Sequence, residues 1–279
     1  MAGSGRCGSS LEGGLMAIKA TMLGLLIYAA MIVLLAAVVA YAARRGRWGD
    51  RLFGASFVVL AGAFVLRWIQ VEHAPLQSLL EVFLCLGMLS WPLWQFCRRY
   101  LGADGPAGAA VVGLVLLFPV GFVFSAESQH LPPALRSWLF VPHVAAYMVA
   151  YMILTLASVQ AVMQLAAQGA GEVEASVRRE QATYNMVLLG FPLLTLGLAL
   201  GALWGQLAWG DYWGWDPKEL WSLATFLVYL EYLHLRAMFG SRRARVNSIL
   251  ALVGGVLIVI TLLWVNLASR FTGMHAYTT

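Results

Sequence analysis

Eight apolar runs constrain this chain more than any other feature of its sequence. They cover residues 20–42, 51–68, 77–97, 106–124, 140–165, 186–207, 219–239 and 247–268. These lengths match what is needed to cross the roughly 30 Å hydrocarbon core of a bilayer. Because backbone amides in lipid must be hydrogen-bonded within the segment, such runs fold as helices. The sequence therefore predicts an all-α, polytopic membrane bundle of about eight transmembrane helices.

The composition supports a membrane protein and excludes a nucleic-acid-binding protein. Hydrophobic residues make up 61% of the chain and charged residues only 11%, whereas soluble domains carry about 25% charged residues. The net charge of +5 comes from short basic clusters between apolar runs. Such clusters are typical of membrane topology signals, so we expect membrane lipid and no nucleic acid around the chain.

The basic residues predict the orientation of the bundle. Of the eighteen Lys and Arg residues, twelve follow the first, third, fifth and seventh runs. Since positively charged loops stay inside, both termini are expected on the outer side. Residues 1–15 are rich in Gly and Ser and are expected to be disordered, with Met16 an alternative start. Residues 16–279 are then a single membrane domain.

The cysteines do not indicate a function for this chain. Its three cysteines, Cys7, Cys85 and Cys97, form no C-x-x-C or C-x-x-C-H motif. The chain is therefore neither a thioredoxin-like redox protein nor a carrier of covalent c-type haem. Cys85 and Cys97 are expected to be small buried apolar side chains.

A tryptophan-rich strip, WGDYWGWDPKEL at 209–220, lies between the sixth and seventh runs. Asp216, Pro217 and Glu219 predict a capped helix start. The residues from about Trp204 to Trp215 are then expected outside the membrane or along its surface. The strip is either an interfacial belt or a platform for a planar ligand, because indoles supply flat faces and Gly205, Gly210 and Gly214 allow close approach. The platform is favoured, because a belt usually has one or two tryptophans per helix end, whereas four precede this helix: Trp204, Trp209, Trp213 and Trp215.

Two histidines share the depth of this strip. His143 begins the fifth run, and His275 follows the eighth. Imidazole is a common axial ligand of haem iron, so two histidines beside an aromatic platform indicate a bis-His metalloporphyrin site. His234 lies about 25 Å along the seventh helix at 1.5 Å per residue. The residues alone leave it either bonded to a neighbouring helix or functional.

Other polar residues at the outer side carry weaker signals. His73 and His130 are treated as loop residues, and Glu81 as either a functional carboxylate or an interfacial one. Arg136, Arg270 and Lys218 are alternatives for pairing with a haem propionate. Asp216 and Glu219 suit helix capping better than catalysis.

The stretch WGQLAWGDYWGWDPKELWSLATFLVYLEYLHLR resembles the WWD signature of the haem-handling proteins of cytochrome c maturation. WDPKE followed by the histidine of YLHLR is similar to the CcsA (ResC) family of system II cytochrome c synthases. HAPLQSLLEVF resembles that family's HxPxxxxYE stretch, except that Leu80 replaces the tyrosine. The resemblance covers most of residues 20–277.

The resemblance implies a role for each candidate residue. His143 and His275 would ligate iron at the external site, and His234 would ligate it at an inner site whose second ligand belongs to a CcsB (ResB) partner. Trp204, Trp209, Gly210, Trp213, Gly214, Trp215 and Trp221 would contact haem b. The candidates for the catalytic step are His143, His275, Trp209, Trp213, Trp215 and Asp216.

The implied activity is export of haem b and its attachment, by thioether bonds, to the C-x-x-C-H motif of apocytochrome c. The implied partners are CcsB, apocytochrome c and a thiol-reducing pathway. The implied location is the plasma membrane with an external site, or the thylakoid membrane in a plastid.

Three alternatives remain. A CcmC-like protein would deliver haem without ligating it, but it has fewer spans and no PKE after the signature. A haem A synthase would show paired histidines on repeated helical units. A transporter or scaffold would leave the strip and its flanking histidines unexplained.

Overall fold

The computed structural model describes residues 21–127 and 131–264. All of the regular structure in these ranges is helical, which confirms the predicted all-α class. The α-helices are α1 (Met22–Ala42), α2 (Gly46–Val71), α3 (Leu79–Phe96), α4 (Pro106–Phe122), α5 (Phe140–Gly169), α6 (Val173–Trp209), α7 (Pro217–Phe239) and α8 (Ala244–Val259). Short 3-10 or π segments occupy Cys97–Leu101, Pro133–Arg136, Gly240–Arg243 and Ile260–Trp264.

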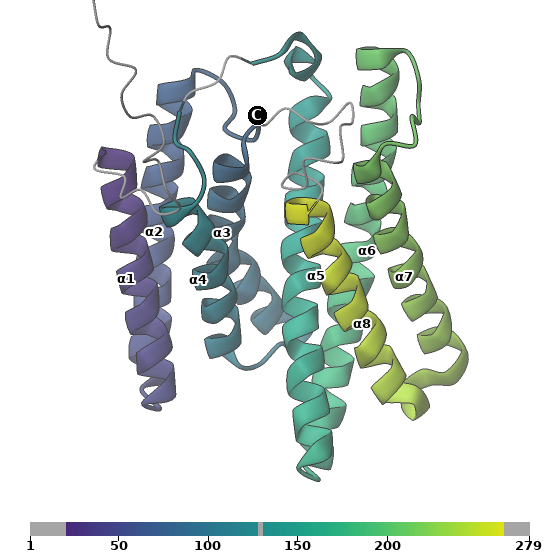
Figure 1. The fold of residues 1–279 in the computed structure, drawn as a ribbon. Helices are drawn as coiled ribbons and strands as arrows, with labels where there is room; N and C mark the ends of the chain where they lie inside the picture. The colour runs from purple at the N-terminus through teal and green to yellow at the C-terminus, as the bar shows by residue number, and fades with distance from the viewer. Residues whose placement is uncertain (1–20, 128–130, 265–279) are drawn as a thin grey trace, which may run out of the picture.

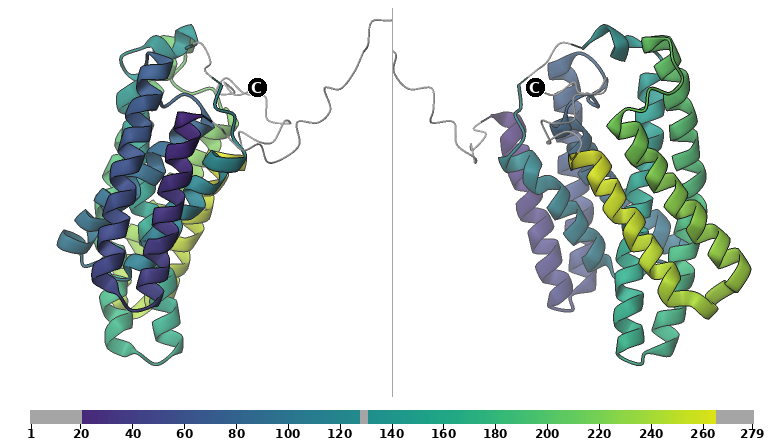
Figure 2. Two further views of the ribbon diagram at one scale, coloured as in Figure 1. Left: turned by 90° about the vertical axis from the view of Figure 1, so that its left-hand side faces the viewer. Right: turned by 45° about the vertical axis from the view of Figure 1, so that its right-hand side comes forward.

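The helices form two neighbouring groups, α1–α4 and α5–α8, which meet where α3 packs on α5 (Figure 1). Within the second group α5 and α6 are antiparallel and pack along much of their lengths, while α8 lies against α5 and α7 (Figure 2). The start of α5, the end of α6 and the start of α7 lie at the end of the bundle that is uppermost in Figure 1. We refer to this as the upper end.

Within the described residues, each of the eight expected spans overlaps one α-helix, and residues 265–268 of the last span lie outside the described part of the chain. Six helical segments are long and apolar enough to cross a membrane. The last of them, Pro217–Leu263, combines α7 and α8, which fold back on each other (Figure 1). Helix α4 is apolar but has only 17 residues. The number of crossings and the external termini therefore stay predictions.

The polar sequence of residues 168–185 predicts an inner loop, but most of this segment is helical in the structure, so the prediction is wrong. Helix α5 continues to Gly169 and α6 begins at Val173, so only three residues connect them. Two charged residues of the segment, both on α6, form ion pairs with other elements: Arg179 with Asp104 at 3.1 Å, and Glu180 with Arg236 at 2.8 Å. Partners on other elements thus stabilise the helical conformation of a segment whose polarity is typical of a loop.

The start of α7 has the predicted capping structure. Asp216 is the N-cap, Pro217 is the first helical residue, and the Glu219 side chain accepts a hydrogen bond from the Asp216 backbone N–H at 3.1 Å. Helix α6 runs to Trp209 and ends at Gly210, whose φ of 88° suits glycine. Trp204 and Trp209 are therefore helical, and only residues 210–216 form an irregular connection.

Candidate functional site

A cavity of about 200 Å³ opens at the upper end between α5, α6 and the start of α7. His143, Gly201, Trp204, Trp213 and Glu219 are among the residues that line it. The lining also includes residues from the start of α3 and from the segment that follows α8. The cavity thus joins both helix groups at the point where the sequence placed the aromatic strip.

The imidazole of His143 is oriented by the neighbouring helix. Its Nδ1 lies 2.8 Å from the carbonyl oxygen of Gly197 on α6. A carbonyl oxygen can only accept, so Nδ1 donates its proton and the lone pair is on Nε2. This is the tautomer of a metal-binding histidine whose second nitrogen is fixed by a hydrogen bond. The half-buried ring lines the cavity.

Two aromatic rings pack against the imidazole of His143. The Trp204 ring is stacked on it at 5.8 Å between centroids, and the Tyr147 ring meets it edge-on at 5.1 Å. Trp204 is buried, and its Nε1–H donates to the carbonyl oxygen of Ala134 at 3.0 Å. Gly201 leaves room for this arrangement, because an added Cβ there would lie 2.6 Å from His143 Cε1.

The strip folds back over the end of α6. Trp209 packs edge-on against Trp204 at 4.7 Å. Gly205 permits the return, since a Cβ there would lie 3.1 Å from the backbone oxygen of Asp211. Glu219 then fixes the strip from α7, because its carboxylate accepts the Gly214 N–H at 2.9 Å. In this arrangement Gly205 and Gly214 allow close contacts of the protein's own backbone.

Trp213 and Trp215 flank Gly214 in the sequence, and their side chains lie in different environments. Trp213 lines the cavity, and its buried Nε1–H has no acceptor among the described residues. Trp215 is 68% exposed and has a φ of 57°, a left-handed conformation that is uncommon for a residue with a bulky side chain. The two rings meet edge-on at 6.0 Å.

Of the remaining predicted residues, Lys218 lines the cavity, whereas Asp216, Gly210 and Trp221 do not. Asp216 is buried, and its carboxylate accepts the Lys218 N–H at 2.8 Å, which is a capping contact. Gly210 is exposed, and Trp221 lies half-buried one turn into α7, outside the cavity lining. His275 and His130 lie outside the described residues.

Among the described residues, His234 makes no hydrogen bond to a neighbouring helix. It is exposed on the surface of α7, and its Nδ1 lies 3.0 Å from the carbonyl oxygen of Leu230 on the same helix. As for His143, this contact leaves the lone pair on Nε2. The described residues include no group of three or more His, Cys, Asp or Glu side chains that could hold a metal ion.

Sequence reasoning missed several residues that shape the site. Gly197 and Tyr147 orient His143, and Gly201 makes space for it. The signal was present as small residues at helical spacing in α6, which are typical of close helix packing in membranes. The sequence indicates Arg67 only as one of the basic residues used to predict orientation, whereas in the structure it forms a buried ion pair with Glu81. Glu81 is thus a buried, paired carboxylate.

The chain is similar to known cytochrome c biogenesis proteins. The chain is 32% identical over 271 residues to the cytochrome c biogenesis protein CcsA of Synechococcus sp. (strain WH7803), covering 81% of this chain and 83% of the relative. It is 32% identical over 247 residues to the CcsA protein of Guillardia theta, covering 76% and 79%.

A solved structure of the cytochrome c haem lyase CcmF matches the fold with a TM-score of 0.63 and 20% identity, over 90% of this chain and 48% of that chain. The family model described as cytochrome C assembly protein matches residues 21–272. The chain therefore belongs to the cytochrome c assembly protein family and is related within it to the CcsA proteins.

Proposed function

We propose that this protein binds haem at the upper cavity and attaches it to apocytochrome c. Family membership places the chain in cytochrome c maturation. The single observation that supports the finer proposal is His143, which carries its lone pair on Nε2 in a cavity wall made largely of aromatic and aliphatic side chains. Imidazole nitrogen is a common axial ligand of haem iron.

The residues at this cavity fit a porphyrin. Trp204 and Tyr147 provide ring surfaces beside the ligating imidazole. The buried N–H of Trp213, which has no acceptor among the described residues, can donate to a polar group of a bound molecule. Trp209 and the exposed Trp215 extend the aromatic surface from the cavity along the strip. His275 is proposed as the second iron ligand.

The proposed chemistry needs no nucleophile from the protein. Each substrate thiol adds across a haem vinyl group: a C–S bond forms at one vinyl carbon, and the thiol hydrogen goes to the other. Cys85 and Cys97 are buried within helices and do not line the cavity. The protein contributes by holding the reactants together, which can be worth several kcal/mol.

His234 is proposed as the ligand of a second, inner haem. Its exposed position on α7 fits a site completed by another subunit, because no second imidazole accompanies it on the described part of the chain. We propose a CcsB (ResB) subunit as this partner, and a thiol-reducing pathway that keeps the acceptor cysteines reduced. The upper end would face the outside of the plasma membrane, or the thylakoid lumen in a plastid.

A covalent-haem assay tests this function. The chain is co-expressed with its CcsB partner and an acceptor that carries C-x-x-C-H, and haem on the denatured acceptor is detected by peroxidase staining. Wild type is expected to give covalent haem and His143→Ala much less, with recovery on added imidazole. Haem bound to the complex without any covalent product would instead favour a CcmC-like delivery protein.

A further inference from the structure

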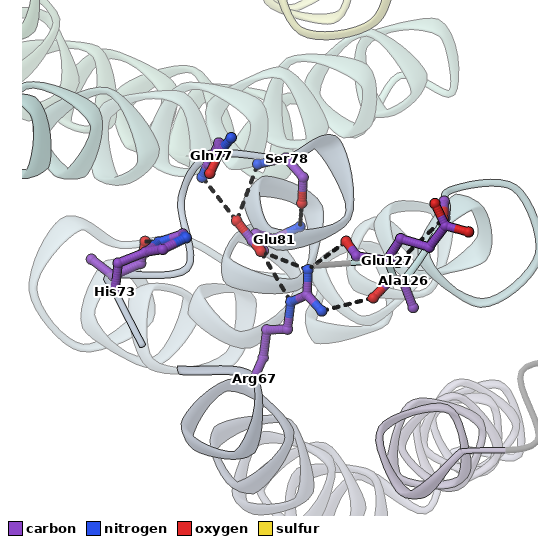
Figure 3. Close-up of polar contacts among 9 residues, drawn as sticks. Arg67, His73, Gln77, Ser78, Glu81, Ala126 and Glu127 are labelled. Atoms are coloured by element: carbon purple, nitrogen blue, oxygen red, sulfur yellow. Dashed lines mark hydrogen bonds and ion pairs between the residues drawn. The ribbon is translucent and has the colours of Figure 1, made fainter. Parts of the chain in front are cut away.

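Arg67 and Glu81 form an ion pair that is closed off from solvent. Arg67 lies on α2 and Glu81 on α3, and the Arg67 Nη2 to Glu81 Oε1 distance is 2.9 Å (Figure 3). Arg67 Nε also donates to the same oxygen at 3.0 Å. Each side chain is only 2% exposed.

The pair is bonded to backbone on both sides. Arg67 Nη1 donates to the carbonyl oxygen of Ala126 at 2.8 Å, and Nη2 donates to that of Glu127 at 3.2 Å. The Glu81 Oε2 atom accepts the N–H groups of Gln77 at 2.9 Å and Ser78 at 3.1 Å (Figure 3). The pair therefore links the end of α2, the connection that leads into α3, and the chain that follows α4.

Such a pair is poorly explained by stability alone. Removing two charges from water is costly, and apolar replacements of buried pairs are often as stable or more so. A fully bonded buried network instead favours one arrangement of the backbone, because any displaced partner leaves a buried charge unsatisfied. The role of the network therefore depends on which backbone segment it fixes in place.

The backbone that it holds forms part of the cavity wall. Leu76, Gln77, Leu79 and Val82 line the cavity that also contains His143. Gln77 and Ser78 are the two residues whose N–H groups bond to Glu81. Neither Arg67 nor Glu81 lines the cavity. The ion pair therefore contacts the backbone of this wall without lining the cavity itself.

We propose that Glu81, oriented by Arg67, is a positioning residue that fixes the 76–82 wall of the haem cavity. The inference rests on the proposed function, because the wall matters only if the cavity binds haem. In this proposal Glu81 does not contact the substrate. Its carboxylate acts through the backbone N–H groups of Gln77 and Ser78.

Glu81→Gln tests this role with little change in size. Every group facing the carboxylate is a donor, whereas glutamine has one acceptor oxygen and one NH₂ group. Either orientation of the amide places its NH₂ against a donor. We expect faster hydrogen exchange in a peptide covering 73–79, and about tenfold weaker binding of haem titrated into the haem-depleted complex with the partner.

Glu180→Gln is the matched control. Glu180 is 3% exposed, pairs with Arg236, and accepts a hydrogen bond from Asn247, so it also faces only donors. It lies far from the cavity lining, on the opposite part of α6. We expect a comparable loss of thermal stability with wild-type haem affinity at the site that His143→Ala abolishes.

Glu81→Asp covers the case in which Glu81→Gln does not fold. Aspartate keeps the charge opposite Arg67, but it is one methylene too short to reach the guanidinium and both N–H groups. Faster exchange at 73–79 together with weaker haem binding supports the proposal. Faster exchange with unchanged haem binding overturns it, as does unchanged exchange. Absence of His143-dependent haem in wild type would end the proposed function, and this inference with it.

Discussion

The imidazole of His143 lies nearly parallel to the indole of Trp204, with 5.8 Å between centroids and 18° between planes. The Gly197 carbonyl oxygen holds the ring at Nδ1, and the Ala134 carbonyl oxygen holds Trp204 at Nε1. The ring of His143 is thus oriented by a hydrogen bond at its edge and by stacking on its face. This arrangement makes the geometry of the site testable by substitutions that leave His143 itself intact.

Gly201→Ala is expected to disturb the site without removing any functional group. The new Cβ would lie 2.6 Å from His143 Cε1 and 2.9 Å from Nδ1, so the ring must shift away from the Gly197 carbonyl. We expect loss of the His143-dependent haem absorbance in the purified complex.

Gly62→Ala on α2 is the matched control, because nothing lies within 4 Å of a Cβ at that position. It should stabilise the helix by about 1 kcal/mol and leave the haem spectrum unchanged. Equal haem absorbance in the two variants would contradict the stated role of Gly201.

Trp204→Phe is expected to remove one hydrogen bond and keep an aromatic face beside His143. The Ala134 carbonyl would lose its partner, which costs about 1 kcal/mol on average. Trp94→Phe is the control, since Trp94 is also buried but its Nε1–H has no acceptor among the described residues. Thermal unfolding should show a larger loss of stability for Trp204→Phe than for Trp94→Phe. Equal losses of stability would argue against the hydrogen bond between Trp204 and Ala134.

Asp216 is expected to act as a helix cap and not as a catalytic group. Asparagine also accepts a hydrogen bond at an N-cap, so Asp216→Asn should retain covalent haem attachment, whereas Asp216→Ala should lose about 1 kcal/mol of stability. The acceptor assay and thermal unfolding measure the two effects. Loss of attachment in a stable Asp216→Asn protein would instead assign the carboxylate a chemical role.

The orientation of the bundle can be tested with single cysteines. In a Cys7→Ser background, the remaining Cys85 and Cys97 are buried. A membrane-impermeant maleimide applied to intact cells should label Ser125→Cys, which is exposed after α4, and should not label Ala170→Cys, which is exposed between α5 and α6. Permeabilised cells should show both labelled. The opposite pattern would invert the predicted topology.

Local signals in the sequence predicted much of the fold. Apolar runs placed all eight described helices, and the pattern Asp216-Pro217-x-Glu219 predicted the capping box that starts α7. These features depend on residues within one or two helical turns. The 168–185 segment could not be predicted in this way, because its helix is stabilised by distant partners such as Asp104 and Arg236.

The same reasoning explains which parts of the site were missed. The sequence indicated His143 and the tryptophans by their residue types, but not the Gly197 carbonyl that orients the histidine from another helix. Arg67 and Glu81 are separated by fourteen residues and a helix connection, so their pairing follows only from the packing of α2 on α3. Long-range backbone contacts leave little trace in one sequence.

The most direct test of the account is the absorption spectrum of the detergent-purified protein, co-expressed with its partner, in the reduced and oxidised states. His143→Ala, His275→Ala and Gly62→Ala are measured beside wild type. We predict a low-spin haem spectrum in wild type and Gly62→Ala that is weakened in both histidine variants and recovered by imidazole. Haem that is unaffected by either histidine substitution would contradict the external site, and a wild-type complex without haem would contradict the proposed function.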